Sequence, residues 1–190
     1  MATKKITKEI KKEEKMKTEN PMRKIKMEKL VLSCGGTAEK LEKSVKLLTV
    51  ITKRKIKEVV SSKRIPSFGV RPGLKTGAVV TIRGAEKEAL LKRLFVAVNN
   101  KIKKKQIETN HFSFGITEYL EIPDMEYQRD IGILGLNVTA VFARAGKRVN
   151  IKKKKQSKTP AKQDVKPEEI IEYLIKMGIN VEEKQNNDSQ

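Results

Sequence analysis

Residues 133–143 read ILGLNVTAVFA, and this stretch indicates which kind of fold the chain adopts. Apolar side chains recur at every second position from Leu134 to Phe142, and Asn137 and Thr139 stand between them. Because successive side chains of a β-strand point to opposite faces, the pattern predicts a strand with one apolar face and one polar face. Such a strand belongs to a sheet that is buried on one side and free on the other.

Three further stretches predict strands of the same sheet. Residues 77–83 alternate as GAVVTIR before Gly84, and residues 111–119 place three apolar side chains on one face. Residues 25–33 hold five apolar side chains and are followed by Gly35-Gly36, which is typical of a strand that ends in a turn.

Helical periodicity marks three other segments. Thr37 is a suitable N-cap for a helix with apolar residues at helical spacing, and residues 86–102 carry the clearest apolar stripe. Pro167 opens a short helix that Gly178 closes. Residues 53–75 contain Pro and Gly without a clean period, which predicts a long basic loop with short extended pieces.

Helices and strands in this order do not alternate one for one, which favours an α+β fold over a doubly wound parallel sheet. We expect a largely antiparallel β-sheet with α-helices packed on one face. Residues 21–180 form the single domain of this prediction, residues 1–20 a disordered basic arm and residues 181–190 a polar C-terminal tail. Apolar runs are far shorter than the roughly 20 residues of a membrane helix, and no secretory signal precedes the charged start, so we expect an intracellular, cytoplasmic protein.

Basic residues outnumber acidic ones, 43 to 23, which gives a formal net charge of +20. The excess lies in three segments, residues 1–26, 53–75 and 144–166, and the rest of the chain is close to neutral. A phosphate backbone relieves the self-repulsion of such segments and releases counterions, so nucleic acid is the leading partner. An acidic membrane surface is disfavoured, because no basic segment carries a strong apolar stripe.

Few residues of this chain suit catalysis or metal binding. The single cysteine, Cys34, excludes a disulfide framework and a Cys-based zinc site, and the single histidine, His111, argues against most metal and Ser-His-Asp chemistry. Gly35-Gly36 lacks the Lys-Ser/Thr of a nucleotide cradle and is interpreted as a turn. We therefore predict no enzyme activity and no cofactor.

The polar face of the predicted sheet offers candidate RNA contacts. Thr81 and Arg83 lie on it in one strand, and Asn137 and Thr139 in another. Hydroxyl, amide and guanidinium groups bond 2′-hydroxyls, phosphates and exposed base edges. An ordinary solvated face would show the same pattern, so the pattern by itself leaves both interpretations open. Phe68 could stack on a base, although a Phe belongs more often to a core.

Six motifs follow one another in an order typical of one protein family. They are NPMRKIKMEKLVLSCGG at 20–36, IPSFGVRPG at 65–73, TIRGAE at 81–86, FSFGITEYLEIPDMEY at 112–127, IGILGLNVTAVFARAG at 131–146 and KPEEIIEYL at 166–174. With them the chain resembles the universal large-subunit ribosomal protein five, the L-five of bacteria and archaea and the L-eleven of eukaryotes. The NPMR start and the basic segment before the last helix resemble the archaeal and eukaryotic form.

The resemblance implies an antiparallel sheet with helices on one side and a structural role in the ribosome. Family members bind 5S rRNA and hold it in the central protuberance of the large subunit, next to large-subunit rRNA and neighbouring ribosomal proteins. They also contribute a bridge to a small-subunit protein. The implied 5S rRNA surface includes Thr81, Arg83 and Gly84, and the loop at 61–75 is implied to reach peptidyl-site tRNA. The implied tRNA-binding residues are Lys63, Arg64, Arg71 and Lys75.

Other implied rRNA contacts fall where this chain departs from the usual family sequence. Ser33 stands in place of an Asn before the glycine turn, Arg54 in place of a Gln, and Asn137 in place of an Asp. Each change removes a carboxylate or amide or adds positive charge, so we expect plainer phosphate binding there. In the segment at 144–166, the residues expected to bind rRNA are Lys147, Arg148, Lys152, Lys153, Lys154 and Lys155.

Two other classes of function compete with a ribosomal one. A free-standing RNA-binding protein or RNA chaperone could use the same sheet face. A nuclease would need an acid–base or metal set, which we do not find in the sequence. Retention on large subunits through a salt wash distinguishes a ribosomal protein from a loosely bound chaperone.

Overall fold

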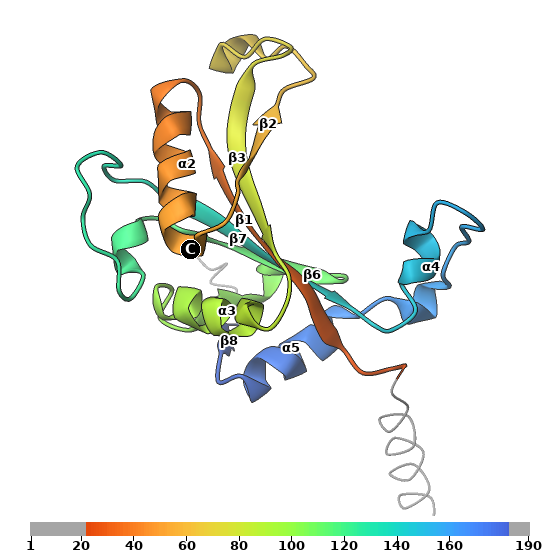
Figure 1. The fold of residues 1–190 in the computed structure, drawn as a ribbon. Coiled ribbons are helices and arrows are strands. Elements are labelled where there is room, and N and C mark those ends of the chain that lie inside the picture. Colours follow the sequence, from red (N-terminus) through yellow and green to blue (C-terminus); the bar gives the residue numbers. More distant parts are fainter. Residues whose placement is uncertain (1–21, 183–190) are drawn as a thin grey trace, which may run out of the picture.

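The computed structural model describes residues 22–182, and a six-stranded antiparallel sheet lies at its centre (Figure 1). The strands follow the order β2-β3-β1-β7-β6-β5, so the first and the last strand of the sheet along the chain pair at its centre. Their bounds are Lys26–Gly35 (β1), Lys57–Val60 (β2), Lys75–Ile82 (β3), Ile107–Glu108 (β5), His111–Ile116 (β6) and Leu136–Ala143 (β7).

Alternation in the sequence determines which face of the sheet is buried. β7 buries four apolar side chains from Leu136 to Phe142 and turns Asn137 and Thr139 to the other face. β1, β3 and β6 likewise bury every second side chain along most of their length. The strands predicted from alternation are confirmed, with ends that differ by up to three residues.

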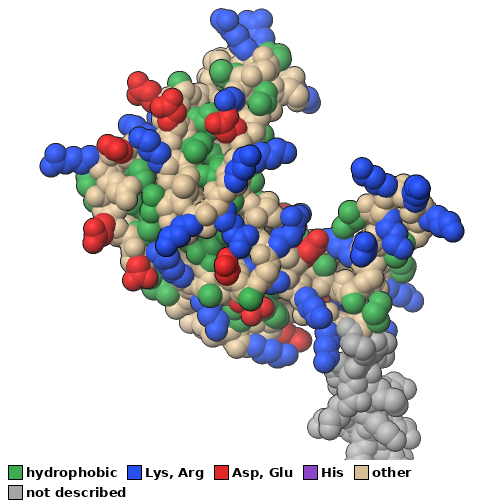
Figure 2. Space-filling model, in the orientation of Figure 1, with side chains coloured by type: hydrophobic (Ala, Val, Ile, Leu, Met, Phe, Trp, Pro, Cys, Tyr) green, Lys and Arg blue, Asp and Glu red, His purple; other side chains and the backbone are tan. Residues whose placement is uncertain are grey.

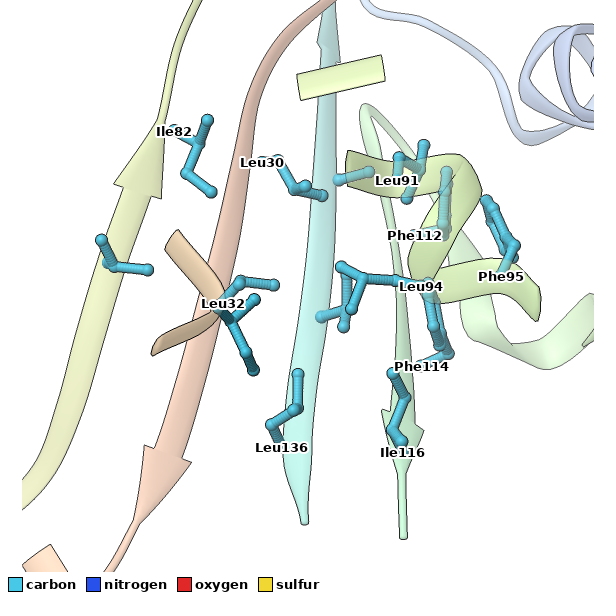
Figure 3. Close-up of a cluster of buried hydrophobic side chains, with 14 of the residues drawn as sticks. Leu30, Leu32, Ile82, Leu91, Leu94, Phe95, Phe112, Phe114, Ile116 and Leu136 are labelled. Carbon is cyan, nitrogen blue, oxygen red and sulfur yellow. The ribbon is translucent and has the colours of Figure 1, made fainter. Parts of the chain in front are cut away.

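Three helices cover the buried face of the sheet. They are α2 (Glu39–Thr52), α3 (Glu86–Val96) and α5 (Pro167–Lys176), and each contributes side chains to one apolar core. Figure 3 shows Leu91 and Leu94 of α3 next to the phenylalanines of β6. The rings of Phe95 and Phe114 stack with their centroids 4.9 Å apart, a geometry favourable to aromatic pairs. The expected α+β fold, with helices on one face, is confirmed.

The first helix starts one residue later than the sequence predicted. Ala38 is its N-cap, with a φ of 47°, and no side chain caps the helix. Thr37 contributes its carbonyl oxygen, which accepts a hydrogen bond from the amide of Lys40 at 3.1 Å. Gly36 lies against this turn, because a Cβ there would come within 2.9 Å of the Lys40 Cβ. The prediction of Thr37 as the cap is therefore wrong.

The second helix ends earlier than predicted. It stops at Val96, and Asn99 and Asn100 adopt left-handed φ values of 52° and 54°, which Asn tolerates better than most residues. Ile102 is buried, but from β4 (Lys101–Lys103), which pairs in parallel with β8 (Asn180–Glu182). The segment expected as a polar tail thus begins within β8. Its last eight residues and the predicted basic arm lie outside the described residues.

Two basic segments project from the body of the sheet (Figure 1). The hairpin of β2 and β3 carries the short 3-10 helix η1 (Pro66–Phe68), so the predicted loop contains an edge strand, β2. The second segment contains α4 (Arg148–Ile151) and η4 (Ala161–Gln163); η2 (Lys104–Gln106) and η3 (Tyr119–Glu121) connect elements of the body. None of the helices between residues 22 and 182 has the length and apolarity to cross a membrane.

Candidate nucleic-acid interface

The sheet face opposite the helices carries short polar side chains from four strands. In one row, Ser113 pairs with Thr139, and Val31 lies between Thr139 and Thr81. In the next row, Asn137 lies between Gly115 and Ser33. The register therefore brings together three residues that the sequence assigned to rRNA contacts, one from each of three strands. We call this surface the free face and define it by Lys29, Ser33, Thr81, His111, Ser113, Asn137 and Thr139.

Sequence reasoning missed three members of the free face. His111 and Lys29 share a third row, in which both pair with Val141, and Ser113 lies in the first row. His111 Nδ1 lies 3.1 Å from the carbonyl oxygen of Thr109, which orients the ring. The signal was present, because Lys29 alternates with buried positions of β1, and His111 and Ser113 with those of β6, just as Thr81 does in β3.

Gly115 keeps the middle of the free face flat. A Cβ at this position would come within 3.2 Å of Asn137 Oδ1, so the side chain of Asn137 occupies the space above the glycine. Gly115 and Asn137 are both exposed. The amide of Asn137 is thereby presented to solvent next to Ser33, and the two side chains form a site with both hydrogen-bond donors and acceptors.

Arg83 and Gly84 lie where β3 ends. Arg83 is exposed and follows Ile82, so the alternation of β3 places it on the same side as Thr81. Gly84 has a φ of 107°, which side-chain-bearing residues rarely adopt, and it turns the chain toward α3. The guanidinium of Arg83 thus extends the free face at one end with a group whose geometry suits bidentate phosphate binding.

Arg54 is not brought to the free face. It follows α2, and its Nη2 donates to Glu86 Oε2 of α3 at 2.5 Å. Both helices cover the buried face of the sheet, so Arg54 lies with them. This ion pair is exposed, with side chains 39% and 74% accessible, and an RNA phosphate could replace the Glu86 carboxylate.

The tip of the β2–β3 hairpin combines positive charge with an exposed aromatic ring. Lys63, Arg64 and Arg71 are exposed there, and we call these three the loop cations. Phe68 in η1 is 78% exposed, so it lies outside the core. Lys75 lies further from the tip, in β3, and its Nζ is 2.6 Å from Glu58 Oε2. Figure 2 shows Lys and Arg side chains gathered at this tip and over α4.

The segment at 144–166, here the Lys-rich segment, is held by side-chain hydrogen bonds. Arg144 Nη2 donates to both carboxylate oxygens of Glu169 in α5, at 2.5 and 2.6 Å. Asn150 Nδ2 donates to Thr159 Oγ1 at 2.7 Å, which closes the loop after α4. Lys147 pairs with Glu28 at 2.8 Å. The cations that stay exposed are Arg148, Lys152, Lys153, Lys154, Lys155, Lys158, Lys162 and Lys166.

One loop has the opposite charge. The connection between β6 and β7 presents five exposed carboxylates, and we call it the acidic loop. Lys46 and Arg93 approach two of them at 3.9 and 3.8 Å. The carboxylates are Glu118, Glu121, Asp124, Glu126 and Asp130.

Nothing in the described part of the chain provides a metal site, since no group of three His, Cys, Asp or Glu side chains converges between residues 22 and 182. The Cys34 thiol is buried in the core, and burial raises its pKa to about 11. A thiol with so high a pKa is a poor nucleophile. The arrangement as a whole suits binding of a polyanion.

Comparisons with known proteins agree with this interpretation. A sequence profile of the C-terminus of the ribosomal L5 protein family matches residues 75–166. The chain is 38% identical to the large ribosomal subunit protein uL5 of Nanoarchaeum equitans, over 86% of this chain and 99% of that protein. It is 32% identical to the uL5 protein of Archaeoglobus fulgidus over 90% and 97%, and 38% identical to that of Sulfurisphaera tokodaii over 86% and 94%.

Proposed function

The chain belongs to the uL5 family of large ribosomal subunit proteins, in its archaeal type, and from this premise we propose that it binds 5S rRNA through the free face. The family is structural, so the chain is a non-catalytic constituent of the large subunit and works on the ribosome in the cytoplasm. The resemblance seen in the sequence is thereby confirmed at the level of family and ribosomal role.

The observation that carries the proposal is the meeting of Ser33, Thr81 and Asn137 on one flat face. The minor groove of an RNA helix is wide and shallow and displays 2′-hydroxyls, which short hydroxyl and amide side chains can reach. Arg83 and Lys29 supply positive charge at the edge of that face for the phosphates on either side. Between residues 22 and 182, helices cover the opposite side of the sheet.

The Lys-rich segment suits a second RNA contact. Its exposed cations lie on a projection that reaches away from the sheet, and the ion pair of Arg144 with Glu169 attaches the base of this projection to α5. Such a projection can hold large-subunit rRNA while the free face holds 5S rRNA. Together these contacts would anchor 5S rRNA in the central protuberance.

The hairpin tip suits contact with peptidyl-site tRNA. The loop cations provide phosphate partners, and the exposed ring of Phe68 provides a face for stacking on an unstacked base or ribose. Lys75 contributes less to this contact, because Glu58 already neutralises it.

The acidic loop suits the bridge to the small subunit. Its carboxylates would repel rRNA, and their charge complements that of a basic ribosomal protein. Neighbouring proteins of the central protuberance are the remaining proposed partners.

One pair of substitutions tests the 5S rRNA proposal. Thr81→Glu places a carboxylate on the free face, and Thr49→Glu makes the same change on an exposed position of α2, on the helix side. Both substitutions lower the net charge of the chain by the same amount. We expect Thr81→Glu to weaken 5S rRNA binding at least tenfold, about 1.4 kcal/mol, and Thr49→Glu less than twofold. Equal losses in a filter-binding assay would mean that net charge, and not the free face, governs the affinity.

A further inference from the structure

A polar hollow of about 620 Å³ lies in the Lys-rich segment, between the loop after α4 and the residue that follows η4. Its volume is within the roughly 300–1,000 Å³ that is typical of small-molecule sites. We call it the Asp164 pocket and define it by Asn150, Gln156, Ser157, Lys158, Thr159 and Asp164. None of these residues was expected from the sequence to bind RNA, and none belongs to the free face, the hairpin tip or the acidic loop.

Asp164 has an unusual charge environment. It is the one carboxylate of a segment that holds ten basic residues. It is exposed, and none of the ion pairs between residues 22 and 182 includes it. A free carboxylate repels phosphate, so it weakens a purely electrostatic contact with RNA. Its position is explained by a ligand that brings hydrogen-bond donors as well as phosphates.

Hydrogen bonds fix the direction of this carboxylate. Asn110, in the turn between β5 and β6, donates from its Nδ2 to Asp164 Oδ1 at 3.0 Å. The Oδ1 of Asn110 accepts from the amide of Val165 at 2.7 Å, and its own amide donates to the carbonyl oxygen of Val165 at 3.0 Å. A carboxylate offers about four lone pairs, so Asp164 can accept further hydrogen bonds while Asn110 holds it. The pocket therefore presents an oriented acceptor.

Other lining residues suit the remaining parts of a nucleotide. Lys158 is exposed and belongs to none of the ion pairs in the described part of the chain, so its ammonium group is available to a phosphate. Asn150 Oδ1 is buried and accepts no hydrogen bond from residues 22–182, which is rare for a buried acceptor. A donor that enters the pocket and displaces the atoms covering this oxygen would satisfy it.

This combination of groups fits a nucleotide better than a peptide. An acidic peptide would bring its carboxylates next to Asp164, and a basic peptide would meet the ten cations of the segment. A nucleotide carries its charge on the phosphate, and its base brings donors without net charge. Adenine, cytosine and guanine each have an exocyclic amino group that donates to a carboxylate or amide oxygen. Uracil has only carbonyl oxygens at its exocyclic positions, and a carboxylate repels them.

We propose that the Asp164 pocket takes one unstacked base of large-subunit rRNA and selects a base with an amino group. Asp164 accepts a hydrogen bond from that amino group, and Lys158 binds a phosphate next to the base. The proposal rests on the proposed rRNA contact of the Lys-rich segment, and it extends this contact from the binding of phosphates to the recognition of a base.

Short single strands of cytidylate and uridylate test this selection, because the two bases have the same size and uracil lacks the amino group. We expect the full chain to bind the cytidylate strand at least about fivefold more tightly than a uridylate strand of the same length. In Asp164→Asn the new amide oxygen can still accept from Asn110, whereas the amide nitrogen donates and suits a uracil carbonyl. We therefore expect the preference to fall to about twofold or less in this variant.

Glu168→Gln is the matched control. Glu168 is exposed in the first turn of α5, outside the pocket, and the substitution removes the same negative charge. If charge alone governs the affinity, both variants bind both strands more tightly and keep the preference for cytidylate. We expect only Asp164→Asn to lose it. The proposal is overturned if the unmodified chain has no preference, or if Asp164→Asn keeps one.

Changing the four lysines at 152–155 to Gln separates base recognition from the rRNA contact on which it rests. These lysines lie outside the pocket, so we expect this variant to weaken the binding of both strands equally and to keep the preference. A weaker lysine variant, together with an unaltered preference in Asp164→Asn, would refute base recognition and leave the rRNA contact standing. If neither change alters binding, both the rRNA contact and the pocket are refuted.

Chemical probing of assembled large subunits identifies the base. Dimethyl sulfate and kethoxal modify unpaired adenine, cytosine and guanine on the edge that carries or adjoins the amino group. We expect one such base to be more reactive in subunits with Asp164→Asn than in subunits with Glu168→Gln. Equal reactivity at every base would overturn the assignment of an rRNA base to the pocket.

Discussion

Replacing Arg144 with Met should destabilise the protein far more than the same replacement at Arg54. Both arginines donate to a glutamate at 2.5 Å, and Arg144 donates in addition to the second oxygen of its glutamate at 2.6 Å. They differ in burial: the Arg144 side chain is 11% exposed and that of Glu169 34%, whereas Arg54 and Glu86 are 39% and 74% exposed. Met keeps most of the apolar packing of the arginine stem in both variants.

Burial determines the expected magnitudes. Removing one partner of a fully buried ion pair costs about 3–5 kcal/mol, because the remaining charge is left without a partner. Glu169 keeps a third of its exposure and is partly rehydrated, so we expect a loss of about 2–3 kcal/mol for Arg144→Met, or about 5–10 °C in Tm. The exposed pair should lose at most about 1 kcal/mol in Arg54→Met.

Urea titrations of both variants measure these differences. Arg144→Met with Glu169→Leu should recover most of the lost stability, because an apolar pair leaves no unpaired charge. The reasoning is refuted if Arg144→Met costs no more than Arg54→Met, or if the double variant is as unstable as the single one.

Three further predictions concern the RNA contacts and the core. Changing the loop cations to Gln, together with Phe68→Ala, should weaken the binding of peptidyl-site tRNA to purified ribosomes by about 1–3 kcal/mol and leave 5S rRNA incorporation intact; defective incorporation with normal tRNA affinity would reverse that assignment. Changing the four lysines at 152–155 to Gln should reduce the salt slope of rRNA binding by about one unit for each phosphate that no longer has a lysine partner, and an unchanged slope would place these lysines outside the interface. Cys34 should resist alkylation at pH 8 until urea unfolds the protein. Rapid labelling of the folded protein would contradict the buried position of the thiol. Burial raises the pKa of Cys34 to about 11, so the thiol of the unfolded chain ionises at a lower pH than that of the folded chain. The unmodified chain should therefore lose stability relative to Cys34→Ala as the pH rises from about 9 to 11.

Alternation was sufficient to predict the sheet, because in a sheet that is buried on one side apolar and polar side chains alternate along each strand. The free-face positions of Thr81 and Asn137 followed from it directly. The helices were harder to delimit. Ile102 fits the apolar stripe of α3 in the sequence, although it lies in β4. A buried position is apolar in a helix and in a short strand alike, so the sequence pattern did not distinguish the two elements.

Contacts between segments that are distant along the chain could not be predicted from the sequence. The pairing of β4 with β8, and that of Arg54 with Glu86, depend on how separate segments meet in space. Exposure of Phe68 was likewise not predictable, because a Phe is usually buried and only the projection of the hairpin removes this one from the core.

Methyl NMR of the full chain with 5S rRNA tests the role of the free face most directly. Val31, Val79 and Val141 lie on the free side of the sheet, whereas Val50 and Val96 are exposed on α2 and α3, on the helix side. We expect the valine methyl resonances of the first group to shift when 5S rRNA binds and those of the second group to stay in place. Shifts confined to Val50 and Val96 would show that RNA binds the helices, and the assignment of the free face to 5S rRNA would be wrong.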